Sequence, residues 1–120
     1  MLFRSTVYTT FIATRDGIAR HQIACAKMVR AIRYTQAWLA EHSAEDLAEI
    51  TESFFPDVAR DILVHSLRRY RQAEIWARTP DVSHRGFARL AESLLSGGFI
   101  ARMPAYTDCV DQSLTTTSKA

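Results

Sequence analysis

Polar and apolar residues alternate loosely over residues 3–13, and this pattern predicts a β-strand. The side chains that would share a face are Val7, Thr9 and Phe11 on one side and Tyr8, Thr10 and Ile12 on the other. Since both faces carry apolar residues, we expect the strand to lie inside a sheet. The rest of the chain shows no convincing second strand, so the backbone groups of this strand need a partner from elsewhere.

A helical period replaces the alternation after residue 14, and it continues with interruptions to residue 114. Either Thr14 or Asp16 is suited to cap the first helical turn. The expected segments are a short turn over 16–20, a long helix to about residue 41, a helix that opens at 43–46 and stops before 56, one from 57 to about 72, one from 83 to 96, and a short segment over 106–114. The chain is therefore predicted to be mainly α, with one N-terminal strand and about five helices.

Four of the predicted boundaries rest on recognisable capping residues. Ser43-Ala44-Glu45-Asp46 resembles a capping box in which aspartate replaces glutamate. Asp57 is suited to cap the helix that follows Pro56, and Ser83 is suited to cap the helix over 83–96. Gly97-Gly98 is expected to end the helix before it, because glycine adopts the left-handed conformation of a helix terminus without steric cost.

Length and charge narrow the class of protein. With 120 residues the chain fits one domain or a piece of a larger one, and an apolar fraction of 48% is enough for a core. A formal charge of +2 gives no field strong enough to require a nucleic acid or an anionic membrane. We find no run long enough to span a membrane and no secretory signal, and we expect residues 115–120 to be a disordered tail behind an ordered part over 1–114.

No motif in the sequence predicts catalysis. His21 and Cys25 stand four residues apart and could present two metal donors on one helix face, but two donors do not make a metal site. The other histidines are isolated, and the sequence contains neither a nucleophile elbow nor a glycine-rich phosphate loop. We therefore expect a protein that is not an enzyme and that needs no cofactor and no metal.

The segment over residues 8–50, YTTFIATRDGIARHQIACAKMVRAIRYTQAWLAEHSAEDLAEI, resembles the C-terminal part of substrate-binding proteins of ABC importers. The similarity is to the nitrate/sulfonate/taurine type, which includes binders of thiamine-pyrimidine precursors. The residues that carry it are Phe11-Ile12-Ala13-Thr14, Ile18-Ala19-Arg20-His21, Ala31 to Leu39, Ser43 to Ala48, Gly97-Gly98-Phe99-Ile100 and the segment over 106–114. The chain differs in having Gln22 where the family has proline before the long helix, and in lacking an export signal.

This resemblance implies that residues 1–114 are the C-terminal portion of one lobe of an α/β periplasmic-binding-protein type II fold. It implies a non-catalytic, periplasmic component that captures a small anionic or heteroaromatic solute, such as a sulfonate, taurine, nitrate or a pyrimidine, and presents it to an ABC permease. Without the signal, a cytoplasmic location is open for the fragment as written. The rest of the protein, or a second copy, would then cover the edge of the predicted strand.

Four residues near the expected cleft edge are the candidate ligand-binding residues, namely Tyr8, Thr9, Thr10 and Arg15. Hydroxyl groups can donate hydrogen bonds to a sulfonate, nitrate or carboxylate, and the arginine adds positive charge. Ordinary strand residues with sheet propensity explain the same pattern equally well.

Two other functions are compatible with the sequence. The first is a stand-alone helical interaction module that dimerises to cover exposed apolar helix faces. The second is a small basic nucleic-acid-binding protein, indicated by Arg68-Arg69-Tyr70-Arg71. The acidic neighbours Asp61 and Glu74 and the near-neutral charge of the chain weaken the second reading, so we expect no nucleic-acid partner.

Overall fold

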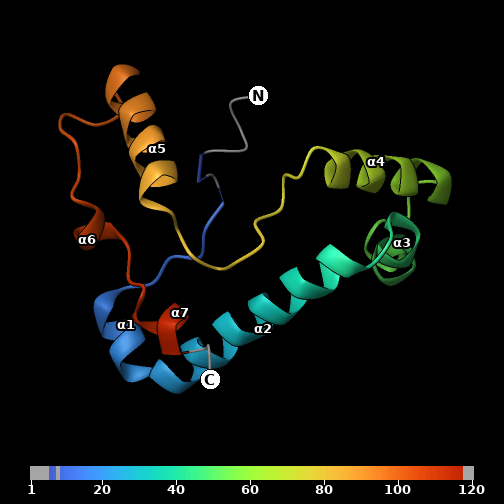
Figure 1. Ribbon diagram of the computed structural model, residues 1–120, viewed down its shortest axis with the longest axis horizontal. Helices are drawn as coiled ribbons and strands as arrows, with labels where there is room; N and C mark the ends of the chain where they lie inside the picture. The colour runs from blue at the N-terminus through green and yellow to red at the C-terminus, as the bar shows by residue number, and fades with distance from the viewer. Residues whose placement is uncertain (1–5, 8, 118–120) are drawn as a thin grey trace. The chain divides into compact units, whose positions relative to one another are not determined.

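The structure, a computed structural model, describes residues 6, 7 and 9–117. These residues form seven α-helices and one short 3₁₀-helix (Figure 1). The elements are α1 (Arg15–Arg20), α2 (Gln22–Glu41), α3 (Ala44–Thr51), the 3₁₀-helix η2 (Glu52–Phe54), α4 (Arg60–Gln72), α5 (His84–Ser96), α6 (Tyr106–Cys109) and α7 (Ser113–Thr117). The chain divides into two compact units: unit 1 is Met1–Ala31 with Pro80–Ala120, and unit 2 is Ile32–Thr79.

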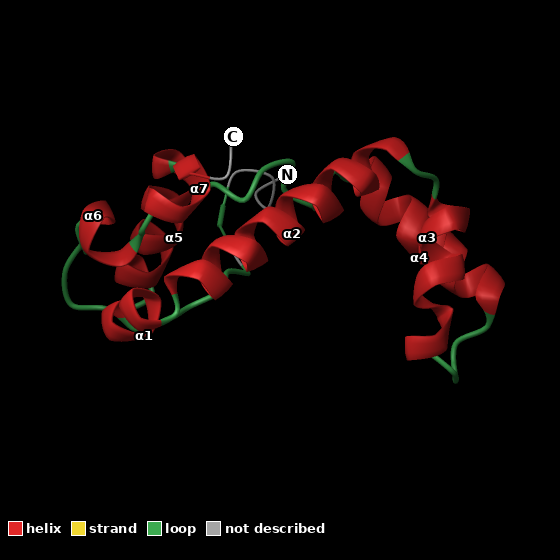
Figure 2. Cartoon of the chain, turned by 90° about the horizontal axis from the view of Figure 1, so that it is seen from below, coloured by secondary structure: helices red, strands yellow, loops and turns green. Residues whose placement is uncertain are grey.

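The predicted N-terminal strand is wrong. Residues 6, 7 and 9–14 form neither strand nor helix, and over the whole described chain the structure contains helices and loops but no strand (Figure 2). The expected α/β periplasmic-binding-protein fold is therefore also wrong, because such a fold requires a sheet. The alternating pattern describes side chains suited to a sheet, but a strand also needs a neighbour for its backbone groups, and the described residues provide none.

The N-terminal segment instead packs against the start of α5 within unit 1. The backbone N–H of Val7 donates to the carbonyl oxygen of Gly86 across 3.5 Å. Gly86 is buried, and a Cβ atom there would lie 2.9 Å from Cγ2 of Val7. Phe11 and Ile12 are 75% and 93% exposed, so the apolar part of the segment finds no core.

Helix starts follow the capping chemistry of the sequence at three places. In α1 the hydroxyl of Thr14 accepts from the N–H of Gly17 at 3.0 Å, and Ser83 does the same for Gly86 in α5. The capping box of α3 is also confirmed, as described below. The expected cap at Asp57 is wrong, because α4 begins at Arg60 with Ala59 as its N-cap and no side-chain hydrogen bond.

The capping box joins Ser43 and Asp46 by three hydrogen bonds. The Ser43 hydroxyl accepts from the Asp46 N–H at 3.1 Å, while Oδ2 of Asp46 accepts from the Ser43 hydroxyl at 2.7 Å and from its N–H at 2.9 Å. These donors favour the ionised carboxylate, so the Ser43 side chain and then its backbone N–H lower the pKa of Asp46.

Small side chains make the contact between α3 and α4 in unit 2. Ala44 and Ala48 of α3 and Leu63 of α4 are the buried apolar residues there. Alanine lets the two helix backbones approach closely. Two surface ion pairs, Arg68 with Glu45 and Arg60 with Glu52, also join this part of the chain.

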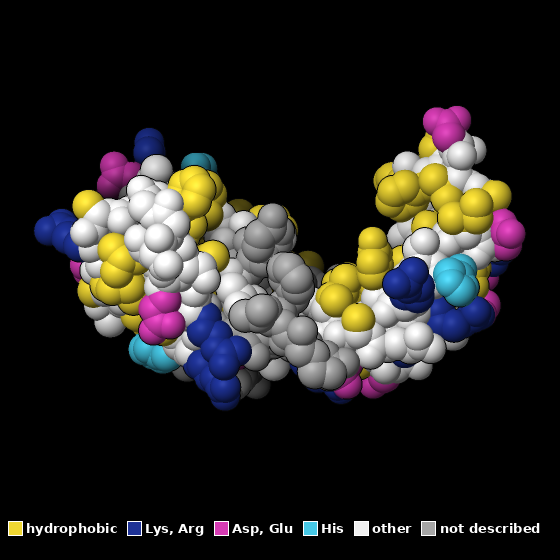
Figure 3. All heavy atoms as spheres, turned by 90° about the horizontal axis from the view of Figure 1, so that it is seen from above, with side chains coloured by type: hydrophobic (Ala, Val, Ile, Leu, Met, Phe, Trp, Pro, Cys, Tyr) yellow, Lys and Arg dark blue, Asp and Glu magenta, His cyan; other side chains and the backbone are white. Residues whose placement is uncertain are grey.

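Most large apolar side chains in the described residues remain partly or largely exposed. Figure 3 shows many hydrophobic side chains, drawn in yellow, on the molecular surface. Ala91 in α5 is the other buried apolar residue, and no side chain in the described chain is both large and fully buried. Apolar groups on this scale on a surface usually mark an interaction site.

The last helix overlaps the predicted tail. Helix α7 covers Ser113–Thr117, and residues 118–120 lie outside the described residues. The division at residue 114 therefore stays a prediction. No helix within the described part of the chain is long and apolar enough to cross a membrane.

We expect the Ser43→Ala substitution to lower the free energy of unfolding by about 1 kcal/mol. The substitution removes the hydroxyl that accepts from the N–H of Asp46 and donates to its carboxylate. Urea unfolding followed by circular dichroism measures this change. Ser53→Ala is the matched control, since Ser53 is exposed and lies in η2 nearby. An equal effect of both substitutions would contradict the capping role.

The capping contribution should also depend on pH. Because the Ser43 donors lower the pKa of Asp46 in the folded chain, their stabilisation is present above the unfolded-state pKa and disappears as pH falls through the folded-state pKa. The stability difference between the wild-type chain and Ser43→Ala should therefore be full near neutral pH and should shrink below about pH 4. A difference that grows on acidification would contradict this sign.

Candidate functional site

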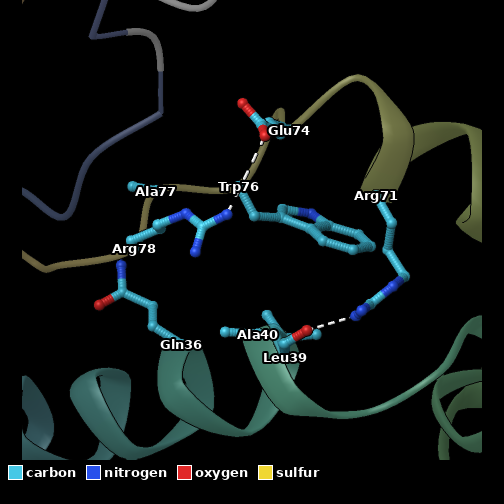
Figure 4. Close-up of a pocket in the computed structure, with 8 residues that line it drawn as sticks. All are labelled: Gln36, Leu39, Ala40, Arg71, Glu74, Trp76, Ala77 and Arg78. Atoms are coloured by element: carbon cyan, nitrogen blue, oxygen red, sulfur yellow. Dashed lines mark hydrogen bonds and ion pairs between the residues drawn. The ribbon is translucent and has the colours of Figure 1, made fainter.

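A small cavity of about 90 Å³ lies within unit 2 (Figure 4). Its lining comes from the last turns of α2, from the end of α4 and from the connector that follows α4. The residues are Gln36, Leu39, Ala40, Arg71, Glu74, Trp76, Ala77 and Arg78.

The connector reaches the cavity because the chain reverses at Glu74. This residue has a positive φ of 48°, the one such non-glycine residue in the described chain. The N–H of Ile75 donates back to the Tyr70 carbonyl at 3.3 Å, and the N–H of Glu74 donates to Arg71 at 3.0 Å. This 6→1 closure is typical of a helix that ends through a left-handed residue, a position that glycine usually takes. The turn carries Trp76 and Arg78 toward the cavity.

Arg71 fixes the wall of the cavity to α2. Its Nη1 donates to the carbonyl oxygen of Leu39, as Figure 4 shows. That carbonyl belongs to the last turn of α2, where a carbonyl oxygen has no helical N–H to accept from, and the N–H of Ser43 is used by Asp46. A guanidinium at a helix C-terminus also offsets the negative end of the helix dipole.

Gln36 supplies the one polar atom of the lining that is buried without a hydrogen-bond partner in the described structure. Its Nε2 donates to the Thr79 carbonyl at 3.0 Å, which fixes the orientation of the amide because a carbonyl requires a donor. The Oε1 atom is then left buried with no partner. A buried acceptor of this kind is costly unless a donor reaches it.

Trp76 forms the apolar wall of the cavity. Its ring meets Tyr70 edge to face with centroids 6.1 Å apart, and Figure 4 shows the indole between the side chains of Arg71 and Arg78. Arg78 Nη2 lies 4.0 Å from Oε1 of Glu74, and both side chains are mostly exposed, so this pair contributes little to stability. Two guanidinium groups against one carboxylate give the lining a formal charge of +1.

The lining can therefore bind a small anionic group, but it offers no arrangement for catalysis. Guanidinium groups recognise carboxylate, sulfonate or nitrate oxygens through charge-assisted hydrogen bonds. At about 90 Å³ the cavity is well below the roughly 300 Å³ of an ordinary ligand pocket, so it fits a head group rather than a large molecule. The described residues include no cluster of three or more potential metal ligands.

The residues predicted from sequence lie in unit 1. Tyr8 falls outside the described residues, and Thr9 and Thr10 are exposed in the irregular N-terminal segment. Arg15 begins α1, and its Nη2 donates to the Asp108 carbonyl oxygen at 3.3 Å. In the part of the chain that is described, no hydrogen bond joins Arg15 to either threonine. Their role in ligand binding stays a prediction.

Arg15 does lie close to an acidic segment and to an open hollow of unit 1. The hollow has a volume of about 420 Å³ and is lined by Arg102–Ala105 and Asp108. The pKa of nearby Asp111 is lowered first by the Ser113 hydroxyl, then by its N–H, and further by the charge of Arg15. Arg15 thus interacts with Asp108 and Asp111 of the same chain.

Sequence reasoning missed the cavity because its residues come from parts of the chain that are far apart in the sequence. The connector carrying Trp76 and Arg78 has no periodic pattern, and Arg71 counted only as part of a basic cluster. A usable signal was present just after the helix end: a tryptophan lies two residues after Glu74 and two before an arginine.

Comparison with known proteins gives one distant similarity. The chain is 23% identical over 107 residues to a protein of Bacillus subtilis (strain 168) named "Putative binding protein YtlA". The aligned region covers 89% of this chain and 32% of that protein, so the chain spans about a third of the length of its relative. No protein-family model matches the sequence, and no solved structure matches it. This similarity gives neither a solute nor a partner for the chain.

We expect Arg71→Ala to release the connector from α2 and to expose Trp76. In a Trp38→Phe background, Trp76 is the only indole, since the chain contains two tryptophans, and its fluorescence should shift to longer wavelength. Arg69→Ala removes an arginine from the same helix without touching the cavity and is the matched control. A shift in the control, or none in Arg71→Ala, would contradict the anchoring role of Arg71.

Proposed function

We propose that this chain is the solute-binding component, or a segment of it, of an ABC-type importer. The observation that carries the proposal is the similarity to a binding protein along 89% of the chain. The resemblance of residues 8–50 to binding proteins of the nitrate/sulfonate/taurine type supports the same reading. In this role the chain is non-catalytic and periplasmic, and its macromolecular partner is an ABC permease.

The proposed ligand is a small anionic or heteroaromatic solute, such as a sulfonate, taurine, nitrate or a pyrimidine. The positive lining of the cavity supports an anion, because Arg71 and Arg78 outnumber Glu74. The indole of Trp76 supports a planar group, which can stack on an aromatic ring.

A second function, a helical interaction module, is favoured by a different observation. Large apolar side chains such as Phe54 and Ile62 in unit 2 are 76% and 58% exposed. Nucleic-acid binding loses support, because two of the three arginines in the basic cluster are engaged within the chain. Arg68 pairs with Glu45, and Arg71 donates to Leu39.

Calorimetric titration of the 120-residue chain with taurine, ethanesulfonate, nitrate and an aminopyrimidine tests the proposal. We expect at least one of these solutes to bind, and Arg78→Gln to weaken that binding about tenfold or more, as the loss of a charge-assisted hydrogen bond should. Arg30→Gln removes an exposed arginine of α2 that is not part of the cavity and serves as the control.

The N-terminal candidates are tested in the same titration. If Thr9→Val, Thr10→Val and Arg15→Gln weaken binding while Arg78→Gln does not, the site lies in unit 1 and not at the cavity. No heat with any of the four solutes at concentrations up to about 10 mM would contradict solute binding by this chain. Adjacent genes for a permease and an ATPase would support the importer, and their absence would count against it.

A further inference from the structure

The connector that follows α4, defined here as residues 73–79, forms one wall of the cavity in unit 2. Four of the lining residues lie in the connector and three in α2. Figure 4 shows the two groups on opposite sides of the cavity. A movement of the connector away from α2 would therefore widen the cavity.

The first end of the connector is held firmly. Three backbone hydrogen bonds, donated by the N–H groups of residues 73–75, return to carbonyl oxygens in the last turn of α4. At the same end the guanidinium of Arg71 donates to the carbonyl oxygen of Leu39 in α2. A bond from a charged donor is stronger than one between neutral groups.

The far end of the connector is held much less firmly. Nε2 of Gln36 donates to the Thr79 carbonyl oxygen at 3.0 Å, which is a bond between neutral groups. In the described part of the chain, residues 76–79 make no backbone hydrogen bond to α2. Within residues 73–79, Trp76 is the one residue that is not exposed, so apolar burial adds little to this attachment.

The bond at the far end also carries a cost. It orients the amide of Gln36 so that Oε1 is buried without a hydrogen-bond partner in the described structure. If the connector moved away at Thr79, water would reach this oxygen and donate to it. Opening at the far end thus breaks one neutral hydrogen bond and relieves one buried acceptor.

The size of the cavity requires such a movement. A cavity of about 90 Å³ is far smaller than the roughly 300 Å³ of an ordinary ligand pocket, so a solute of ordinary size enters only if a wall moves. We propose that the connector opens and closes the cavity, with residues 73–75 as its fixed end and the Gln36–Thr79 bond as its latch. Because Trp76 and Arg78 lie on the moving part, closure brings an indole ring and a positive charge onto the solute. This inference rests on the proposed function, since that solute is what the connector encloses.

Acrylamide quenching of Trp76 fluorescence measures the opening without any solute. The full chain carries Trp38→Phe for this experiment, so that Trp76 is the only indole. We expect Gln36→Leu to raise the quenching constant about twofold or more, because the loss of a hydrogen bond shifts the balance toward the open state. Gln22→Leu is the matched control, since Gln22 is an exposed glutamine of the same helix outside the cavity.

Gln36→Glu separates the latch from a packing defect, because the two side chains have nearly the same shape. At pH 7 the introduced carboxylate has no proton to donate to the Thr79 carbonyl, so quenching should rise as it does in Gln36→Leu. As pH falls from about 7 to about 4, the carboxyl gains a proton and quenching should return toward the value of the unsubstituted side chain. Gln36→Leu should show no such return. Circular dichroism at each pH checks the helix content.

Amide hydrogen exchange at Ile75 locates the fixed end. The N–H of Ile75 donates to the Tyr70 carbonyl oxygen at 3.3 Å, so it should keep its protection in Gln36→Leu. Loss of this protection would mean that the end of α4 unravels, and it would overturn the fixed end at residues 73–75.

The last measurement links the connector to the solute. Taurine, ethanesulfonate, nitrate and an aminopyrimidine are the solutes used. Any of them that binds by calorimetry should lower the quenching of Trp76, after correction for light absorbed by the solute. It should also dissociate about tenfold faster from Gln36→Leu. Binding without a change in Trp76 quenching overturns the proposal, because the solute then lies away from the connector.

The solute-free quenching decides the movement of the connector by itself. Unchanged quenching in Gln36→Leu, or in Gln36→Glu at pH 7, overturns the proposal. If none of the four solutes gives heat, the proposed function fails, while a rise in quenching in both variants still shows that the latch opens.

Discussion

The packing of α3 on α4 through small side chains is the contact on which the rest of unit 2 depends. Ala44 and Ala48 allow the two helices to approach, and Leu63 fills the space between them. This contact holds α4 beside α3, and the reversal at Glu74 ends α4 where Arg71 and the connector meet α2. The packing of α3 on α4 also determines which face of α4 is exposed, because the face that carries Leu63 packs against α3. The position of the cavity thus depends on this helix pair and on the turn that follows it.

Because few apolar side chains of the described residues are buried, polar contacts at the helix ends contribute much of the order of the chain. Thr14, Ser43 and Ser83 satisfy N–H groups at three helix starts, and Arg71 satisfies a carbonyl at the end of α2. Each such contact is worth on the order of 1 kcal/mol, comparable to the burial of a small apolar side chain. Helix ends therefore define the fold as much as apolar burial does.

The predictions from sequence were right where the signal was local. The hydroxyl caps depend on residues three apart, and the structure confirms them at Ser43 and Ser83, with Thr14 and not Asp16 at α1. The strand over 3–13 was wrong because strand formation depends on a distant partner, which no local pattern supplies. Asp57 failed as a cap because the turns between Glu52 and Val58 delay the start of α4. The cavity was missed for a related reason: Gln36 and Arg78 are far apart in the sequence and meet only through the reversal at Glu74.

The attachment of the N-terminal segment has a consequence for the order in which the molecule opens. A long backbone hydrogen bond from Val7 joins this segment to α5, and the side chains of Phe11 and Ile12 are largely exposed to solvent. Within the described residues, the free energy of local opening is therefore smaller here than along α3 and α4, where the backbone bonds are helical and the alanines are buried. Amide hydrogens of residues 9–12 should exchange with deuterium before any helix does, and a protease should cut there first. The segment that was expected to form a strand is thus held less firmly by the fold than helices α3 and α4.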